Sequence, residues 1–314
     1  MKEELVSIII PAYNVDEYLE ECVQSLLCQT YTNYEIIIID DGSTDRTYTI
    51  GKQLASENTK IKLFHQENQG VSMARNIGMQ RANGEYYIFV DADDVVMPRY
   101  IENLVACTQK ANMGIIGYTS ERERLATEVN LNPAYESAAD ITENILCGTN
   151  YDGYLWNKIF QRTMIKKYKL EFRSNIVVWE DMLFVLEYLQ NCNKIAVSDA
   201  KLYYYRYREG SAVNNTRIDK YRSKYEVMAE IKRLKFACTD QSKKKVSFLY
   251  FETMFSYLNQ CFIRESSLNK INEILSEVDI MELLKQKNMK LFFKFLYLQT
   301  KVRRKVLTSN CRYN

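Results

Sequence analysis

The sequence has one histidine, three prolines and ten glycines among 314 residues. The single histidine, His65, excludes metal sites built from several histidines and leaves acid–base chemistry to carboxylates. The scarcity of proline and glycine argues against long linkers or disordered segments. No run reaches about 18 uninterrupted apolar residues, the length that a membrane-spanning helix needs. With 46% hydrophobic and 26% charged residues, the composition is that of a soluble globular protein.

Cysteine pairs of metal-site or redox spacing are also missing. Eight cysteines are present, but none forms a Cys-x-x-Cys pair. The N-terminal stretch MKEELVSIII has two acidic residues before its apolar run, unlike a secretory signal peptide. We therefore expect reduced thiols and a cytoplasmic location.

Acidic residues are absent from the C-terminal stretch. Residues 283–314 have nine basic side chains and no acidic one, so the rest of the chain has 33 basic and 40 acidic residues. The net charge of +2 thus conceals a basic tail on an acidic body.

Apolar runs in the first half predict an α/β fold. The strand-like segments are VSIIIP (6–11), YEIIIID (34–40), IKLFH (61–65), EYYIFVD (85–91) and MGIIGYT (113–119). Continuous apolar runs are typical of parallel strands buried on both faces, and helical patterns separate these runs. We expect a mostly parallel central sheet with right-handed crossovers. From about residue 218 the patterns are helical, which predicts a helical C-terminal region.

Polar loops follow three of these strands: PAYN, DDGSTD and DADD. Ligands of parallel sheets bind outside the carboxyl ends of the strands, so the three loops predict one site. The sequence has neither GxGxxG after the first strand nor GxxxxGK[ST], which argues against dinucleotide and P-loop sites. The crowded Asp91, Asp93 and Asp94 suit a hard divalent cation that binds a diphosphate. The alternative is an acidic loop that caps the helix after Pro98.

Four segments resemble the motifs of the family 2 glycosyltransferases, which have the GT-A fold. They are VSIIIPAYN, QTYTNYEIIIIDDGSTD, NQGVSMARNIGMQRANGEYYIFVDADD and WEDMLF, and the resemblance covers roughly residues 5–208. It is nearest to bacterial enzymes that build capsular and other surface polysaccharides. It implies metal-dependent transfer of a sugar, with inversion, from a nucleotide-diphospho-sugar to an acceptor hydroxyl. We expect a UDP-sugar donor and a polyprenyl-linked glycan acceptor.

The resemblance and the change to helical patterns near residue 218 together predict a domain plan. The transferase domain would span 1–215, with a donor half over about 1–120 and an acceptor half over about 121–215. A helical region with a basic amphipathic tail would span 216–314.

Site residues follow from the same resemblance. The implied donor-binding residues are Pro11, Ala12, Tyr13, Asp40, Asp41, Arg75, Asp91 and Arg208. The Asp41 carboxylate suits the imide N–H of uracil or thymine. For Arg75 the alternative is a surface arginine of a helix. Asp93 and Asp94 are the implied ligands of Mn²⁺ or Mg²⁺.

The implied catalytic residues lie in WEDMLF. Inversion needs a base that takes the acceptor's proton, and the resemblance assigns this to Asp181, with Glu180 beside it. The alternative is that both acids merely favour the first turn of a helix. Trp156 is either a sugar-stacking or a core residue, and Arg206 either reaches the diphosphate or ends a strand.

The basic tail predicts an amphipathic helix. Lys290, Lys294, Lys301 and Lys305 fall on one stripe. The opposite side has Leu291, Phe292, Phe295, Leu298, Val302 and Val306. Such a helix is typical of contact with an anionic membrane surface, here the inner face of the cell membrane. The alternative is a helix that packs its apolar side on the protein.

Two other functions stay open at this point. A nucleotidyltransferase also places aspartates and Mg²⁺ beside a nucleotide, but it needs a glycine-rich basic first loop, which PAYNVDEY lacks. A non-catalytic nucleotide-sugar-binding subunit would not need both DADD and WED. Nothing in the sequence predicts nucleic-acid binding.

Overall fold

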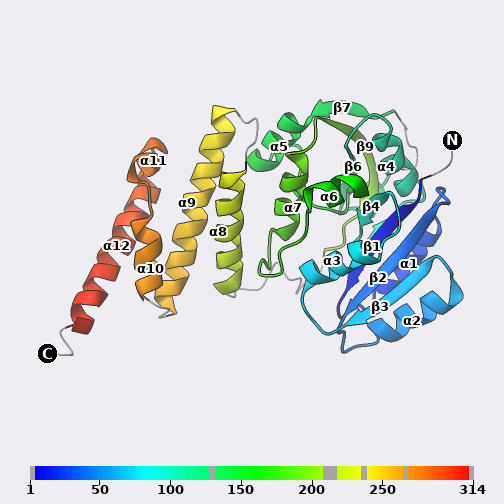
Figure 1. Cartoon of the computed structure of the whole chain (residues 1–314), viewed down its shortest axis with the longest axis horizontal. Helices are drawn as coiled ribbons and strands as arrows, with labels where there is room; N and C mark the ends of the chain where they lie inside the picture. Colours follow the sequence, from blue (N-terminus) through cyan, green and yellow to red (C-terminus); the bar gives the residue numbers. More distant parts are fainter. Residues whose placement is uncertain (1–3, 127–131, 208–217, 235–238, 265–267, 311–314) are drawn as a thin grey trace. The chain divides into compact units, whose positions relative to one another are not determined.

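The computed structural model describes residues 4–126, 132–207, 218–234, 239–264 and 268–310 (Figure 1). The chain forms two compact units, Met1–Ser211 and Ala212–Asn314. The predicted boundary at residues 215 and 216 lies outside the described residues, and the predicted donor and acceptor halves stay a prediction.

The first unit is built on one mixed sheet. Within the described residues the strand order is β3-β2-β1-β4-β8-β6-β9-β5, and β7 pairs with β9. The strands are β1 (Val6–Ala12), β2 (Tyr34–Asp41), β3 (Ile61–Gln66), β4 (Tyr86–Phe89), β5 (Val95–Val96), β6 (Met113–Thr119), β7 (Ala134–Ser137), β8 (Lys158–Gln161) and β9 (Lys194–Tyr204).

Helices connect and cover these strands. The helices of the first unit are α1 (Leu19–Leu27), α2 (Thr47–Glu57), α3 (Val71–Arg81), α4 (Tyr100–Thr108), α5 (Ala138–Cys147), α6 (Arg162–Tyr168), α7 (Glu180–Leu189) and the 3₁₀ turn η1 (Arg122–Arg124).

Strands β1 to β4 form the parallel part of the sheet, as the apolar runs predicted. Side chains alternate between its two faces. Ile8 and Ile10 belong to the core that α1 completes, whereas Ile9 faces α3, where Gly78 leaves room for it. A Cβ atom at Gly78 would lie 2.3 Å from Ile9 Cγ2. Burial on both faces explains why β1 and β2 lack polar alternation, whereas the edge strand β3 is partly exposed.

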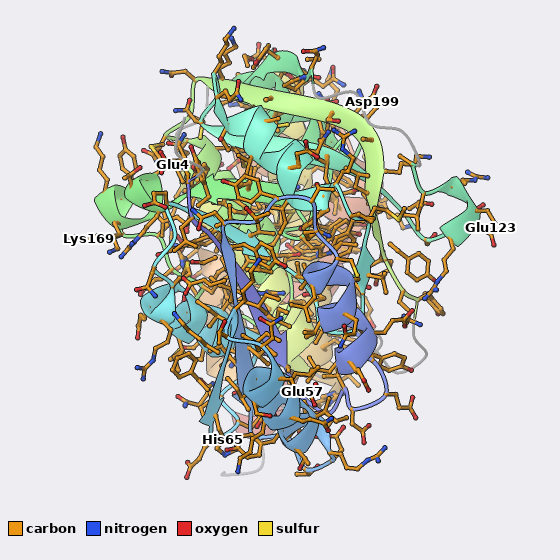
Figure 2. All side chains as sticks on the ribbon, turned by 90° about the vertical axis from the view of Figure 1, so that its right-hand side faces the viewer. Glu4, Glu57, His65, Glu123, Lys169 and Asp199 are labelled. Atoms are coloured by element: carbon orange, nitrogen blue, oxygen red, sulfur yellow. The ribbon has the colours of Figure 1, made fainter. Side chains whose placement is uncertain are left out.

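The edge of the parallel part is β3, where Figure 2 shows His65. Beyond β4 the sheet is mixed: β8 runs antiparallel to both β4 and β6, while β6 and β9 are parallel. The carboxyl ends of β1, β2 and β4 therefore share one edge, and the predicted polar loops leave the sheet there.

The second unit is helical, as predicted, with α8 (Ile218–Arg233), α9 (Asp240–Ile263), α10 (Leu268–Ser276), α11 (Ile280–Lys285) and α12 (Met289–Asn310). Its core includes Phe255 and Leu258 of α9 and Leu283 of α11. None of the helices among the described residues is both long and apolar enough to span a membrane.

The basic tail forms α12, but its apolar side does not face outward. Leu291, Phe295, Leu298 and Val302 are buried in the core of the second unit, so the alternative of packing on protein holds for them. Phe292 is partly buried against the same core, and the side chain of Val306 lies outside the described part of the chain.

Candidate active site

The first two polar loops are bonded to each other. The Asn14 backbone N–H donates to Ser43 Oγ at 3.1 Å, and Asn14 Oδ1 accepts from the Thr44 N–H at 2.8 Å. Asn14 has a left-handed φ of 51°, a conformation that asparagine tolerates better than most residues. Pro11 and Ala12 end β1, and the Tyr13 side chain is about half exposed at the head of this loop.

Asp41 at the end of β2 organises the loop that follows β3. Its Oδ1 accepts from Gln66 Nε2 at 2.6 Å and from the Gln69 N–H at 2.9 Å, and its Oδ2 accepts from the Gly70 N–H at 2.8 Å. The carboxylate is 3% exposed. These bonds indicate that Asp41 fixes the start of α3, and the predicted contact with a nucleobase stays a prediction.

Asp40, the neighbour of Asp41, points to the other side of β2. Its side chain is fully buried, and Oδ2 lies 2.6 Å from His65 Nδ1. The His65 ring packs edge-on against Tyr48 at 5.1 Å. Asp40 therefore contacts the edge strand β3, and its predicted role in donor binding stays a prediction.

The DADD loop after β4 is held by the end of β9. The Tyr203 hydroxyl accepts from the Asp91 N–H at 3.3 Å and donates to Asp94 Oδ2 at 2.5 Å. Arg206 adds its backbone N–H to Asp94 Oδ1 at 2.7 Å and its Nε to the Asp93 carbonyl at 2.7 Å. The Arg206 guanidinium also pairs with Glu21. Arg206 therefore stabilises the conformation of the DADD loop.

Asp94 differs from its neighbours in this loop. It is 1% exposed, and both carboxylate oxygens are bonded to protein donors. Burial, followed by the charges of Asp91 and Asp93, raises the pKa of Asp94 to about 8. These features argue against the predicted role of Asp94 as a metal ligand, because a cation would have to displace bonds that shape the loop.

Arg75 connects the DADD loop to α7. It is buried on α3, and its Nη1 lies 2.8 Å from Glu180 Oε1 while Nη2 lies 3.4 Å from Asp91 Oδ1. The alternative of a surface arginine is wrong, because its side chain is only 8% exposed. Burial raises the pKa of Asp91, and Arg75 opposes this while Asp93 and Glu180 add to it.

Asp181 lies in the first turn of α7, next to Glu180. The preceding residue, Trp179, has a φ of 67°, a strained value for a bulky residue, and α7 begins immediately after it. Asp181 Oδ1 accepts from the Met182 N–H at 2.7 Å. Burial, and then the charge of Glu180, raises the pKa of Asp181 to about 7.

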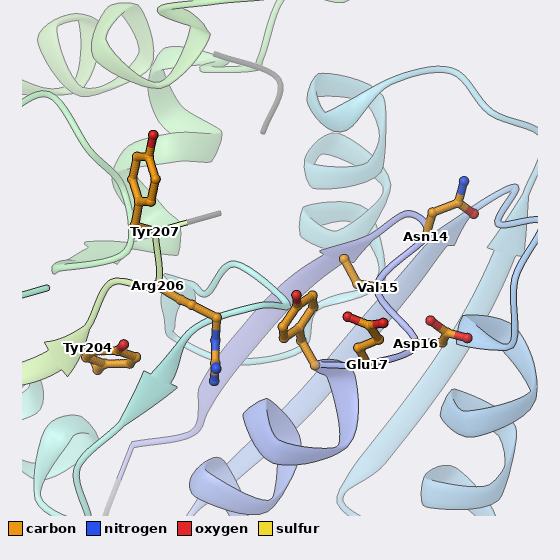
Figure 3. Close-up of a pocket in the computed structure, with 8 residues that line it drawn as sticks. Asn14, Val15, Asp16, Glu17, Tyr204, Arg206 and Tyr207 are labelled. Carbon is orange, nitrogen blue, oxygen red and sulfur yellow. The ribbon is translucent and has the colours of Figure 1, made fainter. Parts of the chain in front are cut away.

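A polar cavity of about 760 Å³ adjoins the first polar loop and the end of β9 (Figure 3). It is lined by Asn14, Val15, Asp16, Glu17, Tyr18, Tyr204, Arg206 and Tyr207. Arg206 belongs both to the cavity wall and to the contacts that hold the DADD loop. The cavity is of a size that small-molecule ligands occupy.

A divalent cation bound at the DADD loop would have only a few carboxylate ligands. Among the described residues no group of three or more His, Cys, Asp or Glu side chains could hold a metal ion. Mg²⁺ usually needs only one or two carboxylates, with phosphate oxygens and water as its other ligands. Asp91, about a third exposed, and the half-buried Asp93 provide two carboxylates whose mutual repulsion a cation would relieve. The donor set therefore fits a cation that arrives with a diphosphate.

Three sequence predictions need separate mention. Arg208 lies outside the described residues. Trp156 is 4% exposed and stacks on Tyr203 at 4.4 Å, so it is a core residue rather than a sugar contact. Tyr203 was not singled out by the sequence, although the run YYYRYR at a strand end was its available signal.

Comparisons with curated proteins identify glycosyltransferases. The chain is 32% identical to the uncharacterized glycosyltransferase EpsJ of Bacillus subtilis over 209 residues, which are 64% of this chain and 61% of EpsJ. It is 41% identical to glycosyltransferase GlyG of Streptococcus pneumoniae over 114 residues, which are 36% of this chain and 38% of GlyG. The match thus spans less than two thirds of the length of these relatives.

Comparisons with solved structures concern the fold. Residues 1–349 of S. aureus TarS, in complex with UDP-GlcNAc, have a TM-score of 0.65 and 21% identity, covering 82% of this chain and 81% of that TarS chain. The mannosyltransferase PcManGT of Pyrobaculum calidifontis, in complex with GDP-Man and Mn²⁺, has a TM-score of 0.57 and 14% identity, covering 93% of this chain and 86% of PcManGT. The predicted GT-A fold with C-terminal helices is thereby confirmed.

The sequence profile of Glycosyl transferase family 2 matches residues 7–168, more than half of the chain. This range contains the PAYN, DDGSTD and DADD loops. The chain therefore belongs to glycosyltransferase family 2, as its motifs predicted.

Proposed function

We propose that this chain is an inverting glycosyltransferase that moves a sugar from a nucleotide-diphospho-sugar to an acceptor hydroxyl. The observation that supports this most is Asp181, a half-buried carboxylate whose pKa is raised to about 7, beside the network of Arg75, Glu180 and Asp91. A base with such a pKa can hold a proton taken from a hydroxyl near neutral pH. Family membership argues against the nucleotidyltransferase alternative.

In this proposal Asp181 accepts a proton, and Glu180 and Arg75 support it. Asp181 accepts the acceptor's proton as the hydroxyl oxygen attacks the anomeric carbon opposite the leaving diphosphate. Glu180 raises the basicity of Asp181 through its charge and is held by Arg75. Arg75, in direct contact with Asp91, also fixes how far the DADD loop lies from α7.

We further propose Asp91 and Asp93, in place of Asp93 and Asp94, as the residues that would hold Mn²⁺ or Mg²⁺. A bound cation would bind the diphosphate and stabilise the negative charge that develops there. Support comes from exposure: the Asp91 side chain is about a third exposed and Asp93 is half-buried, whereas Asp94 is buried and its two oxygens bond to Tyr203 and Arg206.

The decisive experiment is turnover by Asp181→Asn. We expect UDP-sugar binding to persist and the transfer rate to fall by about 10²- to 10⁴-fold, the usual contribution of a general base. The matched control is Asp199→Asn, because Asp199 is an exposed aspartate of β9. A variant that keeps the native rate would contradict the assignment of Asp181. No turnover by the native protein with any nucleotide sugar would favour the non-catalytic binding subunit.

The pH dependence tests the same carboxylate. A base must be deprotonated, so a pKa raised to about 7 predicts a rate that rises with pH and levels off above neutrality. Below pH 7 the rate should fall by about tenfold per pH unit. In Asp181→Asn this limb should vanish, and a native profile that is flat from acid to neutral pH would contradict the proposal.

A UDP-sugar is the proposed donor. TarS, which shares the fold, has been solved with UDP-GlcNAc and with UDP. A thermal-shift screen of UDP-, GDP- and dTDP-sugars with Mn²⁺ tests this choice directly. Preferential stabilisation by a GDP-sugar would overturn it.

We propose that the chain works at the cytoplasmic face of an anionic membrane, on a polyprenyl-linked glycan of a surface polysaccharide. The supporting surface is the outer side of α12, where Met289, Phe293, Leu296 and Tyr297 are between 37% and 63% exposed. Lys301 Nζ lies 4.4 Å from the centre of the Tyr297 ring. Exposed aromatic residues among basic ones suit anionic headgroups, and each basic residue contributes roughly 1 kcal/mol there.

Vesicle flotation tests this surface. The native protein should bind phosphatidylglycerol vesicles at low salt and leave them at high salt. Phe293→Ser with Tyr297→Ser should weaken binding by about tenfold, whereas the control Ile263→Ser, an exposed residue of α9, should not. Substitutions are used rather than deletion of α12, because α12 contributes residues to the core of the second unit. Equal binding to uncharged phosphatidylcholine vesicles would contradict the role of the basic residues.

A further inference from the structure

The loop that precedes β8 lies directly on the first turn of α7. A Cβ atom at Gly153 would lie 2.6 Å from both Cβ and Cγ of Met182, the residue after Asp181. Only glycine permits this approach. Burial raises the pKa of the next residue, Tyr154, and the charges of Asp152 and Asp181 raise it further. Tyr154 therefore lies within electrostatic range of the proposed base.

Tyr154 is the outer member of an aromatic stack. Its ring lies 4.9 Å from Trp156 with an interplanar angle of 14°, and Trp156 lies 4.4 Å from Tyr203 with an angle of 13°. Tyr118 meets Trp156 edge-on at 4.6 Å. Trp156 and Tyr203 are buried, but Tyr154 is 39% exposed. Trp156 thus covers one face of the Tyr154 ring, and the exposed surface of Tyr154 lies away from that face.

A buried lysine holds this tyrosine in place. Lys158 is fully buried, and its Nζ donates to the carbonyls of Asp152 at 2.8 Å and Tyr154 at 2.6 Å, and to Asn157 Oδ1 at 2.8 Å. An ammonium group has three donors, so all of them are used within the loop. Burial lowers the pKa of Lys158 to about 7. Because Lys158 fixes the carbonyls on both sides of Gly153, it is a positioning residue.

We propose that the exposed Tyr154 ring is an acceptor subsite that binds the ring of a sugar, so that the acceptor is a glycoside. The C–H face of a pyranose is apolar and packs on an aromatic ring, while its hydroxyl groups stay available at the edge. A hydroxyl of such a sugar would face Asp181. A free polyol phosphate or a simple alcohol has no ring face for this contact. The inference rests on the proposed function of Asp181 as the base.

Binding of simple glycosides tests the subsite without knowledge of the natural acceptor. The probes are the methyl β-glycosides of glucose, galactose and N-acetylglucosamine, with UDP and Mn²⁺ present, followed by saturation-transfer NMR. Ribitol is the probe without a ring. We expect at least one glycoside to bind through its ring C–H protons, Tyr154→Ala to weaken it about tenfold, and Tyr154→Phe to retain it.

Several outcomes overturn the subsite: no glycoside binds the native protein, ribitol binds equally well, or Tyr154→Ala binds as the native protein does. UDP binding, measured by thermal shift in the same samples, separates the two proposals. If the native protein binds UDP but no glycoside, only the Tyr154 subsite is contradicted. If it binds a glycoside but not UDP, only the transferase proposal is contradicted.

The position of the loop that Lys158 holds can be tested with a variant in which Lys158 itself is unchanged. Gly153→Ala pushes the loop away from Met182 and leaves Lys158 in place. We expect it to weaken glycoside binding about tenfold while UDP binding stays native, and Lys158→Met to act in the same direction if it folds. Native glycoside affinity in Gly153→Ala would show that the position of the loop on α7 does not matter, and would overturn this part.

Discussion

Two aspartate loops flank β1, one after β2 and one after β4, and they use the same residue type in opposite ways. Asp41 accepts three hydrogen bonds from the chain segment after β3. Asp91 lies instead beside Asp93, Glu180 and Arg75, and its pKa is raised by burial. The Asp41 carboxylate is thus satisfied by hydrogen bonds from a neighbouring segment, whereas the loop after β4 has an excess of negative charge.

The difference follows from what the neighbouring segment offers. Residues 66–70 present backbone N–H groups and an amide to Asp41, so its charge is solvated inside the protein. The segment beside the DADD loop offers Tyr203 and the Arg206 backbone, and both are used by Asp94. Crowded carboxylates with raised pKa values, as at Asp91, are typical of functional sites.

Among substitutions in these two loops, the largest effect should come from Asp93→Asn. If Asp91 and Asp93 hold the cation, removal of one charge should weaken metal binding and lower transfer by about 100-fold. Folding should be unaffected, because the substitution relieves repulsion in the loop. Activity is measured over a range of Mn²⁺ concentrations, with thermal unfolding measured in parallel.

Two controls accompany this variant. EDTA should abolish transfer by the native protein, and added Mn²⁺ or Mg²⁺ should restore it. Asp199→Asn should respond to Mn²⁺ as the native protein does. Full activity in EDTA would mean that the crowded loop functions without a cation, and the contrast between the two loops would lose its explanation.

Asp41→Asn should show the opposite pattern, a loss of stability with a smaller direct effect on chemistry. Its new NH₂ group would face at least one of the three protein donors, and a buried donor left unsatisfied costs about 1–3 kcal/mol. Urea unfolding measures this loss. An unchanged midpoint would show that the bonds to residues 66, 69 and 70 do not stabilise the native protein.

The parallel half of the fold could be predicted from sequence because its strands are continuous apolar runs. Beyond β4 the apolar run at 113–119 also predicted β6, but β5, β7 and β8 were not predicted, since β5 and β7 are short and β8 pairs with distant partners. The same limit applies to the site. The motifs indicated Asp91, Asp93 and Asp181, but only the fold reveals that Tyr203 and Arg206, more than a hundred residues along the chain, occupy both oxygens of Asp94.

The smallest effect should come from Asp94→Asn, which separates the two possible pairs of metal ligands. Asparagine keeps an oxygen for the Arg206 N–H, and its NH₂ group can donate to the Tyr203 hydroxyl in place of the bond that Asp94 accepts. The reversed hydrogen bond should lower stability by about 1 kcal/mol. Because Asp94 does not hold the cation in this proposal, activity should fall by less than about tenfold. Mn²⁺ titration of this variant and of Asp93→Asn, side by side, decides the question. If Asp94→Asn needs as much additional Mn²⁺ as Asp93→Asn, then Asp94 holds the cation, and the hydrogen bonds from Tyr203 and Arg206 must yield when the donor binds.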